Sequence, residues 1–284
     1  MKKIISMKNE NELLQITENY YDSKDADLFY HTIWGGEDIH VGIYHYSNES
    51  ISTASQRAVE KMALMLGEVT KNTRILDIGS GYGGAARYLA SRFGCEVSCL
   101  NLSEVENERN IEKNKQFGIS SLVKVYKGNF EELPFKSSHF DIVWCEDSIL
   151  HSKNKFKVLE EVWRVLKING LFIFTDPMQH DACPEGVLQP ILDRIHLEEL
   201  GSVKKYKEFI KKLNFSLEEI IEMPEQLVNH YSRVLDELKK NEFQLLKAGC
   251  SSEYIENMKK GLSNWVNGGK NDYLNWGIFK LRKK

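Results

Sequence analysis

A glycine-rich turn between two apolar runs constrains the fold of this chain more than any other feature. The stretch RILDIGSGYGGAARYLASRFGCEVSCLNLS, residues 74–103, begins with an apolar run and passes through closely spaced glycines into a segment with helical periodicity. Glycine allows the tight turn that joins a strand to a helix. A second apolar run follows, and a strand–helix–strand order places the two strands parallel in one sheet. The stretch therefore predicts an α/β fold.

The alternation of strands and helices continues along the chain. Most of the apolar runs are separated by helix-length segments with apolar residues three and four apart. The runs lie at 74–79, 96–102, 121–128, 140–146 and 171–177, and two further strand-like segments lie at 216–223 and 275–283. This order predicts a Rossmann-like sheet of seven strands, of the α/β class, with helices on both faces.

Two helical segments lie outside this core. Residues 1–70 precede the sheet and are interpreted as an N-terminal helical lid, and residues 71–284 form the core. Within the core, a helical pattern at about 224–266 separates the last two strands and is far longer than an ordinary connection, so we expect this insertion to serve a site. The lid carries a dense aromatic cluster: Tyr20, Tyr21, Phe29, Tyr30, Trp34, Tyr44 and Tyr46.

Composition excludes several functions. The net charge of −3 provides no basic stripe for a phosphate backbone, so a nucleic acid partner is not expected. The polar N-terminus and the lack of a long apolar segment predict a cytoplasmic protein without a membrane span. Five cysteines without CxxC spacing indicate a reducing compartment, and the loop DPMQHDAC (176–183) lacks the spacing of a metal site. The sequence leaves monomer and homodimer open.

The glycines fit two kinds of nucleotide site. Gly79, Gly81 and Gly84 match the G-x-G-x-x-G of a dinucleotide site, whereas Asp77, Gly79, Gly81 and Gly83 match the D-x-G-x-G-x-G of an S-adenosylmethionine site. Asp77 separates the two, because a carboxylate repels a pyrophosphate but complements the ammonium group of the methionyl tail. We therefore predict S-adenosylmethionine as the cofactor, without a metal.

The next two strand ends supply further cofactor candidates. Asn101 stands at the end of the second strand, where an acidic side chain normally binds the ribose hydroxyls, and its amide can donate to one hydroxyl and accept from the other. Asn129 follows the third strand, at the edge of the sheet where open α/β folds bind ligands, and could meet the adenine.

Segments along nearly the whole chain resemble one family of class I methyltransferases. They include YYDSKDADLFYHTIWGGEDIHVGIY, CLNLSEVEN, DSILHS, FTDPM, RIHLEELGS, HYSRVL and GLSNWVNGGKNDYLNWGIF. These segments are similar to sarcosine/dimethylglycine N-methyltransferases, which make glycine betaine. The resemblance implies cofactor contacts by Tyr21, Leu102, Asn107, Phe130 and Glu146.

Other activities stay open at this stage. A phosphoethanolamine N-methyltransferase or a cyclopropane-fatty-acid type enzyme has a similar lid, although the first would call for a basic cluster and the second for a greasy channel. A SAM-binding regulator that has lost catalysis is a third alternative. In every case the expected partner is a small molecule.

Methyl transfer to a small amine mainly requires that nitrogen and carbon are held in line in a dry site. Glu146, Asp147 and His151 lie at or just beyond the end of the fourth strand, where they could orient the amine and accept its proton. Trp34 and His40 lie in the glycine-hinged segment WGGEDIHVG, and we place both near the ligand, with the indole facing positive charge. The predicted catalytic residues are Trp34, His40, Asp147 and His151.

The substrate carboxylate calls for an arginine. Arg194 and Arg233 lie in the helical segments that resemble the substrate region of the family, although helical spacing places both off the apolar stripes and favours a solvated position for each. The remaining predicted substrate contacts are Met178, Tyr206 and Tyr231.

Overall fold

In the computed structural model, which describes residues 14–284, a single seven-stranded sheet forms the centre of the protein. Its order is β3-β2-β1-β4-β5-β7-β6, and β7 runs antiparallel to both of its neighbours. The strands are β1 (Arg74–Ile78), β2 (Glu96–Asn101), β3 (Val123–Lys127), β4 (Phe140–Glu146), β5 (Leu166–Gln179), β6 (Phe215–Glu222) and β7 (Leu274–Lys283). The predicted fold class is confirmed.

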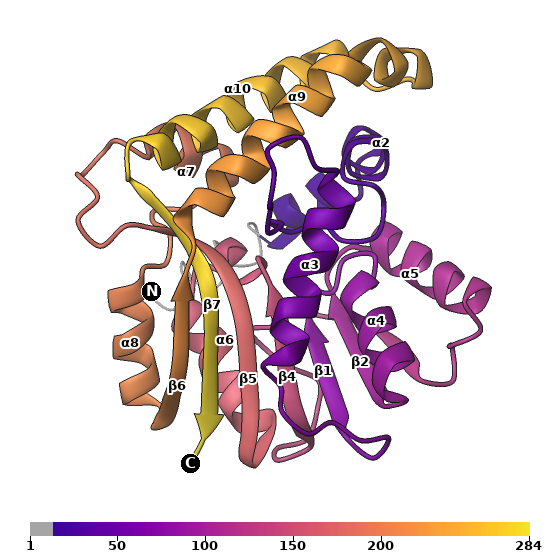
Figure 1. The fold of residues 1–284 in the computed structure, drawn as a ribbon, viewed down its shortest axis with the longest axis vertical. Helices are drawn as coiled ribbons and strands as arrows, with labels where there is room; N and C mark the ends of the chain where they lie inside the picture. The colour runs from indigo at the N-terminus through magenta and orange to yellow at the C-terminus, as the bar shows by residue number, and fades with distance from the viewer. Residues whose placement is uncertain (1–13) are drawn as a thin grey trace, which may run out of the picture.

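Helices cover both faces of the sheet (Figure 1). One face carries α3 (Ile51–Leu64), α4 (Gly84–Phe93) and α5 (Glu104–Gln116), and the other carries α6 (Lys155–Val165) and α8 (Val203–Lys212). Because side chains alternate along a strand, Ile75 packs with the α3 and α4 side while Leu76 packs with the α6 side. This two-sided burial explains why the strands read as nearly continuous apolar runs.

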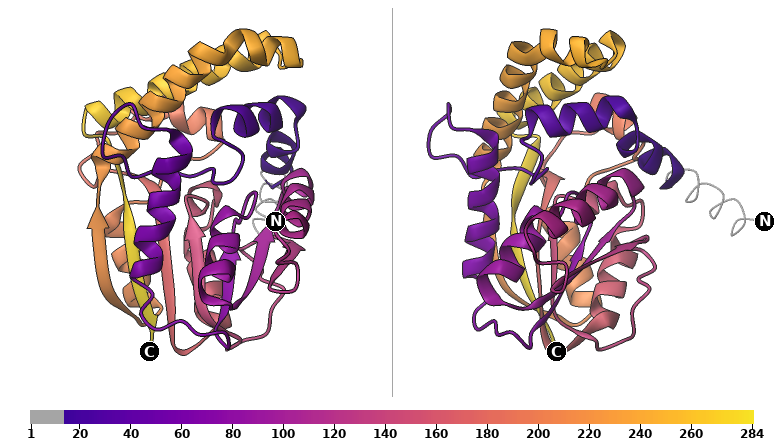
Figure 2. Two further views of the ribbon diagram at one scale, coloured as in Figure 1. Left: turned by 45° about the vertical axis from the view of Figure 1, so that its right-hand side comes forward. Right: turned by 90° about the vertical axis from the view of Figure 1, so that its right-hand side faces the viewer.

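Four further helices lie over the carboxyl ends of the parallel strands. They are α2 (Lys24–Ile33), α7 (Gln189–Ile195), α9 (Pro224–Ala248) and α10 (Ser252–Lys270). The long pair α9 and α10 separates β6 from β7 and extends across the top of the molecule, with α2 beside it (Figures 1 and 2). Residues 224–270 therefore project from the core as a hairpin of two helices.

One part of the N-terminal segment lies with the four helices over the strand ends, which we call the cap, and another part packs against the sheet. Residues 1–13 of the predicted lid lie outside the described residues. Residues 14–21 are helical, α2 follows, and a loop leads to α3, whose Val59 and Met62 pack against the sheet. We use "lid" below for residues 14–44. Phe29, Ile33 and Trp34 of the lid share a hydrophobic cluster with α9 and α10.

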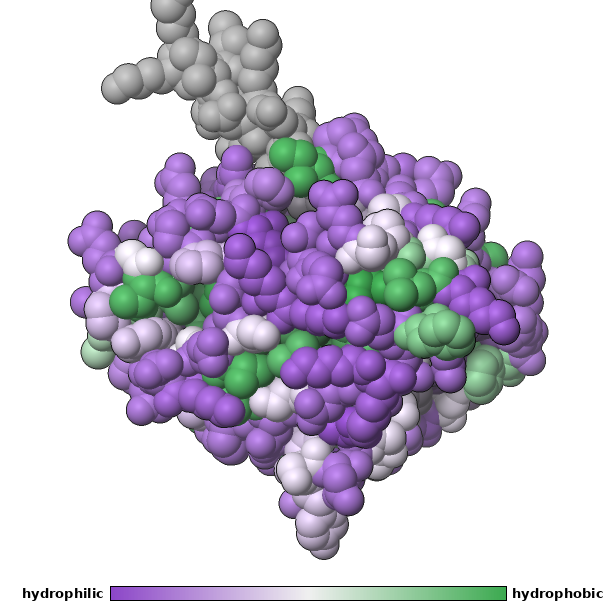
Figure 3. All heavy atoms as spheres, turned by 90° about the horizontal axis from the view of Figure 1, so that it is seen from above, coloured by the Kyte–Doolittle hydropathy of each residue, from purple (hydrophilic) through white to green (hydrophobic). Residues whose placement is uncertain are grey.

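The outer surface above the cap is mainly hydrophilic. Seen from this side, several separate hydrophobic patches lie among polar residues (Figure 3). Phe243 and Leu246 near the end of α9 are exposed. Within residues 14–284, no helix combines the length and the apolar character needed to cross a bilayer.

Candidate active site

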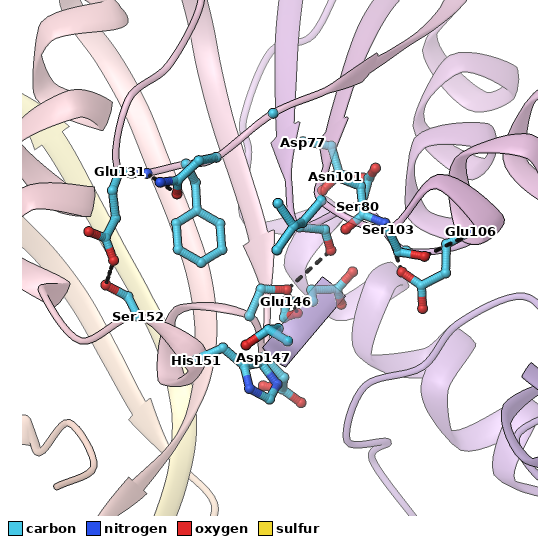
Figure 4. A pocket seen from close by; sticks show the side chains of 18 of the residues that line it. Asp77, Ser80, Asn101, Ser103, Glu106, Glu131, Glu146, Asp147, His151 and Ser152 are labelled. Carbon is cyan, nitrogen blue, oxygen red and sulfur yellow. Dashed lines mark hydrogen bonds between the residues drawn. The ribbon is translucent and has the colours of Figure 1, made fainter. Parts of the chain in front are cut away.

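A cavity of about 870 Å³ lies between the carboxyl ends of the strands and the lid. This volume falls within the roughly 300–1,000 Å³ of small-molecule sites. Figure 4 shows Asp77, Asn101 and Glu106 on one side of it and Glu131 and Ser152 on the other. The predicted residues that line it are Tyr21, His40, Asp77, Gly79, Gly81, Asn101, Leu102, Asn129, Phe130, Glu146, Asp147 and His151.

The glycine turn forms the floor of this cavity at the end of β1. Gly79 and Gly81 both have positive φ, 71° and 49°, which strains any residue with a Cβ. A Cβ on Gly79 would overlap the side chain of Ser148, whose hydroxyl donates to the Gly79 carbonyl at 3.1 Å. Gly83 does not line the cavity; it is the N-cap of α4, and a Cβ there would overlap Asn110 of α5.

Carboxylates from three segments surround the buried imidazole of His40. Its Nε2 lies 3.4 Å from Glu146 Oε1 and 3.9 Å from Asp38 Oδ1. The 3.4 Å contact is not aligned as a hydrogen bond, so both atoms lack a hydrogen-bond partner among the described residues. Asp77 lies at the end of β1 beside this group and is 3% exposed. The cluster is therefore rich in carboxyl groups and has unused acceptor capacity.

Burial sets the protonation of this cluster. Desolvation raises the pKa of Asp77 well above its usual range, with Glu146 as a second cause, and raises the pKa of Glu146 to about 7. For His40, burial disfavours the imidazolium, but the nearby carboxylates, led by Glu146, more than compensate and raise its pKa. A cation that enters the cavity would stabilise the ionised carboxylates, so the site is built to bind positive charge.

Asp147 connects the lid to the sheet. It has a positive φ of 51°, a conformation that Asp tolerates better than most residues. Its Oδ2 accepts a hydrogen bond from the Val41 amide at 2.7 Å, and its Oδ1 accepts one from Trp276 Nε1 at 2.7 Å. Because both oxygens are used, Asp147 fixes the loop that carries His40 over the cavity rather than capping the turn that follows it.

His151 and Tyr21 both line the cavity and contact each other there. Tyr21 Oη lies 3.0 Å from His151 Nε2, and either atom can be the donor. Burial, with a smaller effect of Lys155, lowers the pKa of His151 to about 4. His151 is therefore a neutral imidazole at physiological pH, and its pKa shift is opposite in direction to that of His40.

Glu106 is a cavity residue that sequence reasoning missed. Asn101 Nδ2 donates to Glu106 Oε2 at 2.7 Å, while Glu106 Oε1 has no hydrogen-bond partner among the described residues. Ser103 and Glu106 fit an S-x-x-E capping box, so the sequence pattern directs this side chain to the helix terminus rather than to a ligand. Asn107 does not line the cavity; its Nδ2 donates to the Asn101 carbonyl at 3.2 Å.

Three of the predicted substrate residues are held elsewhere in the structure. Met178 is fully buried in the core, and the Tyr206 hydroxyl donates to Asp176 Oδ2 at 2.6 Å. Arg233 Nε donates to the Glu49 carbonyl at 2.9 Å, and its guanidinium lies 2.6 Å from Glu237. The expectation of a solvated Arg233 is wrong, because its side chain is only 14% exposed.

Arg194 and Tyr231, the other two predicted substrate residues, have side-chain polar groups that no ion pair or hydrogen bond to a described carboxylate occupies. Within residues 14–284, Arg194 forms no ion pair; its guanidinium contacts the sulfur of Met258, and the side chain is half-buried rather than solvated. Tyr231 stacks on Trp265 at 5.1 Å between ring centroids, and its hydroxyl has no hydrogen bond to any described residue. Neither side chain lines the cavity, but both retain polar groups that could bind a ligand.

Trp34 lies behind the cavity wall. It is 6% exposed and packs with Phe29 and His230, and its Nε1 donates to the His40 carbonyl at 3.4 Å. The structure therefore brings His40, Asp147 and His151 together but leaves Trp34 as support for the His40 backbone.

We expect the ligand-free protein to lose stability as the pH rises from about 6.5 to about 8. Burial raises the pKa of Glu106, Glu146 and Asp176 to about 7, above the unfolded value, so the folded state holds protons that the unfolded state releases. The lowered pKa values of His151 and His230 act in the opposite direction, but only at more acidic pH. The expected loss is about 1–3 kcal/mol, measured by denaturant titration.

The Glu146→Gln variant provides the check on this assignment. It removes one titrating group, so the free energy of unfolding should fall less steeply with pH than in the unmodified protein. A free energy of unfolding that increases over the same pH range would contradict the prediction.

Comparisons with known proteins agree with this geometry. The methyltransferase domain family matches residues 76–174. The chain is 50% identical to the sarcosine/dimethylglycine N-methyltransferase of Aphanothece halophytica, over 94% of this chain and 96% of that protein. It is 49% identical to the protein of the same name from Halorhodospira halochloris, over 96% and 98% of the two chains.

Solved structures give the same result. A candidate sarcosine dimethylglycine methyltransferase from Galdieria sulphuraria has a TM-score of 0.88 and 41% identity, over 93% of this chain and 99% of that one. A Haemonchus contortus phosphoethanolamine N-methyltransferase, solved with phosphomonomethylethanolamine and S-adenosylhomocysteine, has a TM-score of 0.78 at 20% identity, over 94% and 60% of the two chains. The second likeness concerns the fold alone.

Proposed function

The chain belongs to the sarcosine/dimethylglycine N-methyltransferase family of S-adenosylmethionine-dependent enzymes, and from that membership we propose that it methylates sarcosine and dimethylglycine on nitrogen to yield glycine betaine. The observation that carries the proposal is the buried group of carboxylates beside the glycine turn. A methyl donor and a methylammonium product are both cationic, and an anionic, desolvated cavity favours such ligands. The proposal includes a cytoplasmic location and no nucleic acid partner.

The polar groups of the cavity fit the proposed cofactor. When bound, S-adenosylmethionine supplies the methyl group on a positively charged sulfonium. Asp77 and Glu146 would face its cationic end, and the unpartnered Oε1 of Glu106 would accept a hydrogen bond from a ribose hydroxyl. Phe130 and Asn129 line the part of the cavity that would hold the adenine. Two buried acceptors without partners, Glu106 Oε1 and Glu146 Oε1, support this placement.

The residues between the cofactor and the lid would position the acceptor amine. Tyr21 and His151 form a polar pair in the cavity wall, and Asp147 fixes the loop that covers the cavity near His40. Because His151 is neutral at physiological pH, it can accept a hydrogen bond from the amine without opposing its charge. Positioning of this kind can contribute about 7–11 kcal/mol to the reaction.

Arg194 is the proposed partner of the substrate carboxylate, with Tyr231 beside it. The lack of an ion pair within the described chain leaves its guanidinium available, whereas Arg233 already contacts Glu49 and Glu237. A guanidinium binds a carboxylate through two parallel hydrogen bonds, and a tyrosine hydroxyl can add a third.

We expect kcat/KM for the acceptor amine to rise with pH between about 7 and 9. Only the free-base amine attacks, and its unperturbed pKa lies near that of a lysine amine, about 10. Ionisation of Glu146 near pH 7 acts in the same direction, because it strengthens cation binding. A flat profile, with chemistry shown to be rate-limiting, would indicate that the site lowers the amine pKa or contains a dedicated base.

The proposed activity is tested by product formation. The protein is incubated with S-adenosylmethionine and a panel of glycine, sarcosine, dimethylglycine, phosphoethanolamine and an unsaturated phospholipid, and S-adenosylhomocysteine and the methylated products are measured. Turnover of sarcosine and dimethylglycine is expected. Turnover of phosphoethanolamine or of the lipid alone would replace the proposed substrate, and S-adenosylhomocysteine binding without turnover of any acceptor would indicate a regulator.

A further inference from the structure

Asp22 of the lid binds the N-terminus of the helix that borders the cavity. Ser103 is the N-cap of α5, and its hydroxyl donates to Asp22 Oδ1 at 2.6 Å. The same oxygen accepts a hydrogen bond from the Val105 amide at 3.3 Å. A carboxylate is favoured at this position because it meets the positive end of the helix dipole.

Asp25 makes the equivalent contact with another helix. Ser251 is the N-cap of α10; its hydroxyl donates to Asp25 Oδ2 at 2.5 Å, and its amide donates to Asp25 Oδ1 at 3.0 Å. The lid therefore connects α5, on the cofactor side, to α10, in the insertion. The two contacts have the same chemistry, but only the first lies at the cavity.

The contact at α5 continues into the cavity. The Ser103 hydroxyl oxygen accepts a hydrogen bond from the Glu106 amide at 3.1 Å, which caps the helix. Glu106 then accepts from Asn101 through Oε2, and its Oε1 is buried without a partner. Ser103 and Glu106 are 2% and 4% exposed, so this chain of contacts is shielded from water. It runs without a gap from the lid to a cavity atom.

We propose that Asp22, through Ser103 and Glu106, couples closure of the lid to occupancy of the ribose end of the cofactor cavity. The inference rests on the proposed function, which places a ribose hydroxyl at Glu106. A hydroxyl donor at Oε1 fixes Glu106 and with it the first turn of α5, where the serine hydroxyl and the Val105 amide bind Asp22. By linkage, a lid held closed must then favour the bound ligand to the same extent.

The coupling has a direct consequence for the active site. Tyr21 immediately precedes Asp22, and its hydroxyl reaches His151. The contact between Asp22 and α5 therefore holds the Tyr21 side chain in the cavity wall. Asp22 acts here as a positioning residue, and Tyr21 is the residue that it positions.

The test compares Asp22→Ala with Asp25→Ala in the full chain, with S-adenosylhomocysteine as the probe. Affinity is measured by calorimetry, and hydrogen–deuterium exchange of residues 14–33 is measured with and without the probe. In the unmodified protein the probe should slow exchange in this segment. Asp22→Ala should bind the probe about ten-fold more weakly and lose this response, whereas Asp25→Ala, which leaves the contact at α5 intact, should keep the response and lose less affinity than Asp22→Ala.

Asp22→Asn retains an acceptor oxygen and should restore most of the coupling, which separates a specific contact from a folding defect. The inference is overturned if Asp22→Ala keeps the affinity and the exchange response of the unmodified protein, or if the two alanine variants behave alike. If the unmodified protein does not bind the probe at all, the proposed function itself is overturned, and the inference with it.

Discussion

Replacement of Asp77 by alanine is expected to weaken binding of S-adenosylhomocysteine by about 100-fold or more, because the ammonium group of the ligand would lose its charged partner in a desolvated site. Asp77 is buried at the end of β1, directly before the glycine turn. Its carboxyl makes no hydrogen bond to another described residue, so its oxygens are available to a ligand, and a bound cation would favour the ionised form. Isothermal calorimetry measures the change.

The same variant should not lower the stability of the ligand-free protein. Burial raises the pKa of Asp77 well above its usual range, which means that the folded protein gains nothing from the ionised carboxylate when no cation is bound. The melting temperature of Asp77→Ala should therefore equal or exceed that of the unmodified protein. A loss of binding that merely follows a loss of folding would not support the assigned role.

Asp141→Ala is the matched control. Asp141 lies on the neighbouring strand β4 but at the opposite end of the sheet, where it accepts from the Arg74 amide at 2.9 Å and pairs with Lys167 at 2.6 Å. It should leave the affinity for S-adenosylhomocysteine unchanged. The cofactor assignment is contradicted if Asp77→Ala binds S-adenosylhomocysteine with an affinity within a few-fold of that of the unmodified protein. It is also contradicted if the unmodified protein binds NAD more tightly than S-adenosylhomocysteine.

The sheet and the position of Asp77 and the glycines at its edge could be predicted from the sequence because their signals are local. Asp77, Gly79 and Gly81 lie within one turn of each other along the chain, and the strand on which they depend is recognisable from its own apolar residues. An aspartate just before a glycine turn has one physical consequence, a carboxyl group at the carboxyl edge of the sheet. No distant residue is needed to reach it.

The substrate half depends on contacts between distant segments. Tyr206 was predicted to contact the substrate, but its hydroxyl donates a hydrogen bond to Asp176, which lies on β5. Trp34 was predicted as a ligand contact because it is a large aromatic beside glycines. It lies six positions before His40, and tertiary packing places only the His40 side chain in the cavity. Neither outcome has a signature in composition or periodicity.

Glu106 illustrates a different limit. Ser103 is the N-cap of α5, and the ordinary geometry of a capping box would turn Glu106 back to the helix terminus. The amide of Asn101 instead holds the glutamate at the cavity. Asn101 at the strand end and Glu106 five residues later thus supply together the carboxyl group that an acidic strand end would have supplied. Only the contact between them reveals this.

Arg194 and Arg233 were equivalent in the sequence and differ in the structure, so the two arginines test the substrate half directly. Arg194→Met is expected to raise the KM for dimethylglycine by about 100-fold or more, because a guanidinium–carboxylate pair in a partly desolvated site contributes roughly 1.5–3 kcal/mol per charged hydrogen bond. The affinity for S-adenosylhomocysteine should stay unchanged. Steady-state kinetics and calorimetry measure the two quantities separately.

Arg233→Met supplies the matched control, since it removes the same charge from a neighbouring helix. It should change the KM little and instead lower the melting temperature, because Arg233 contacts Glu49 and Glu237. Arg194→Lys should recover only part of the loss, since an ammonium cannot form the two parallel hydrogen bonds of a guanidinium. An acceptor amine without a carboxylate should react equally well with the unmodified protein and with Arg194→Met. If Arg233→Met raises the KM and Arg194→Met does not, the carboxylate binds at α9, and the availability of a guanidinium in the ligand-free protein does not identify its substrate contact.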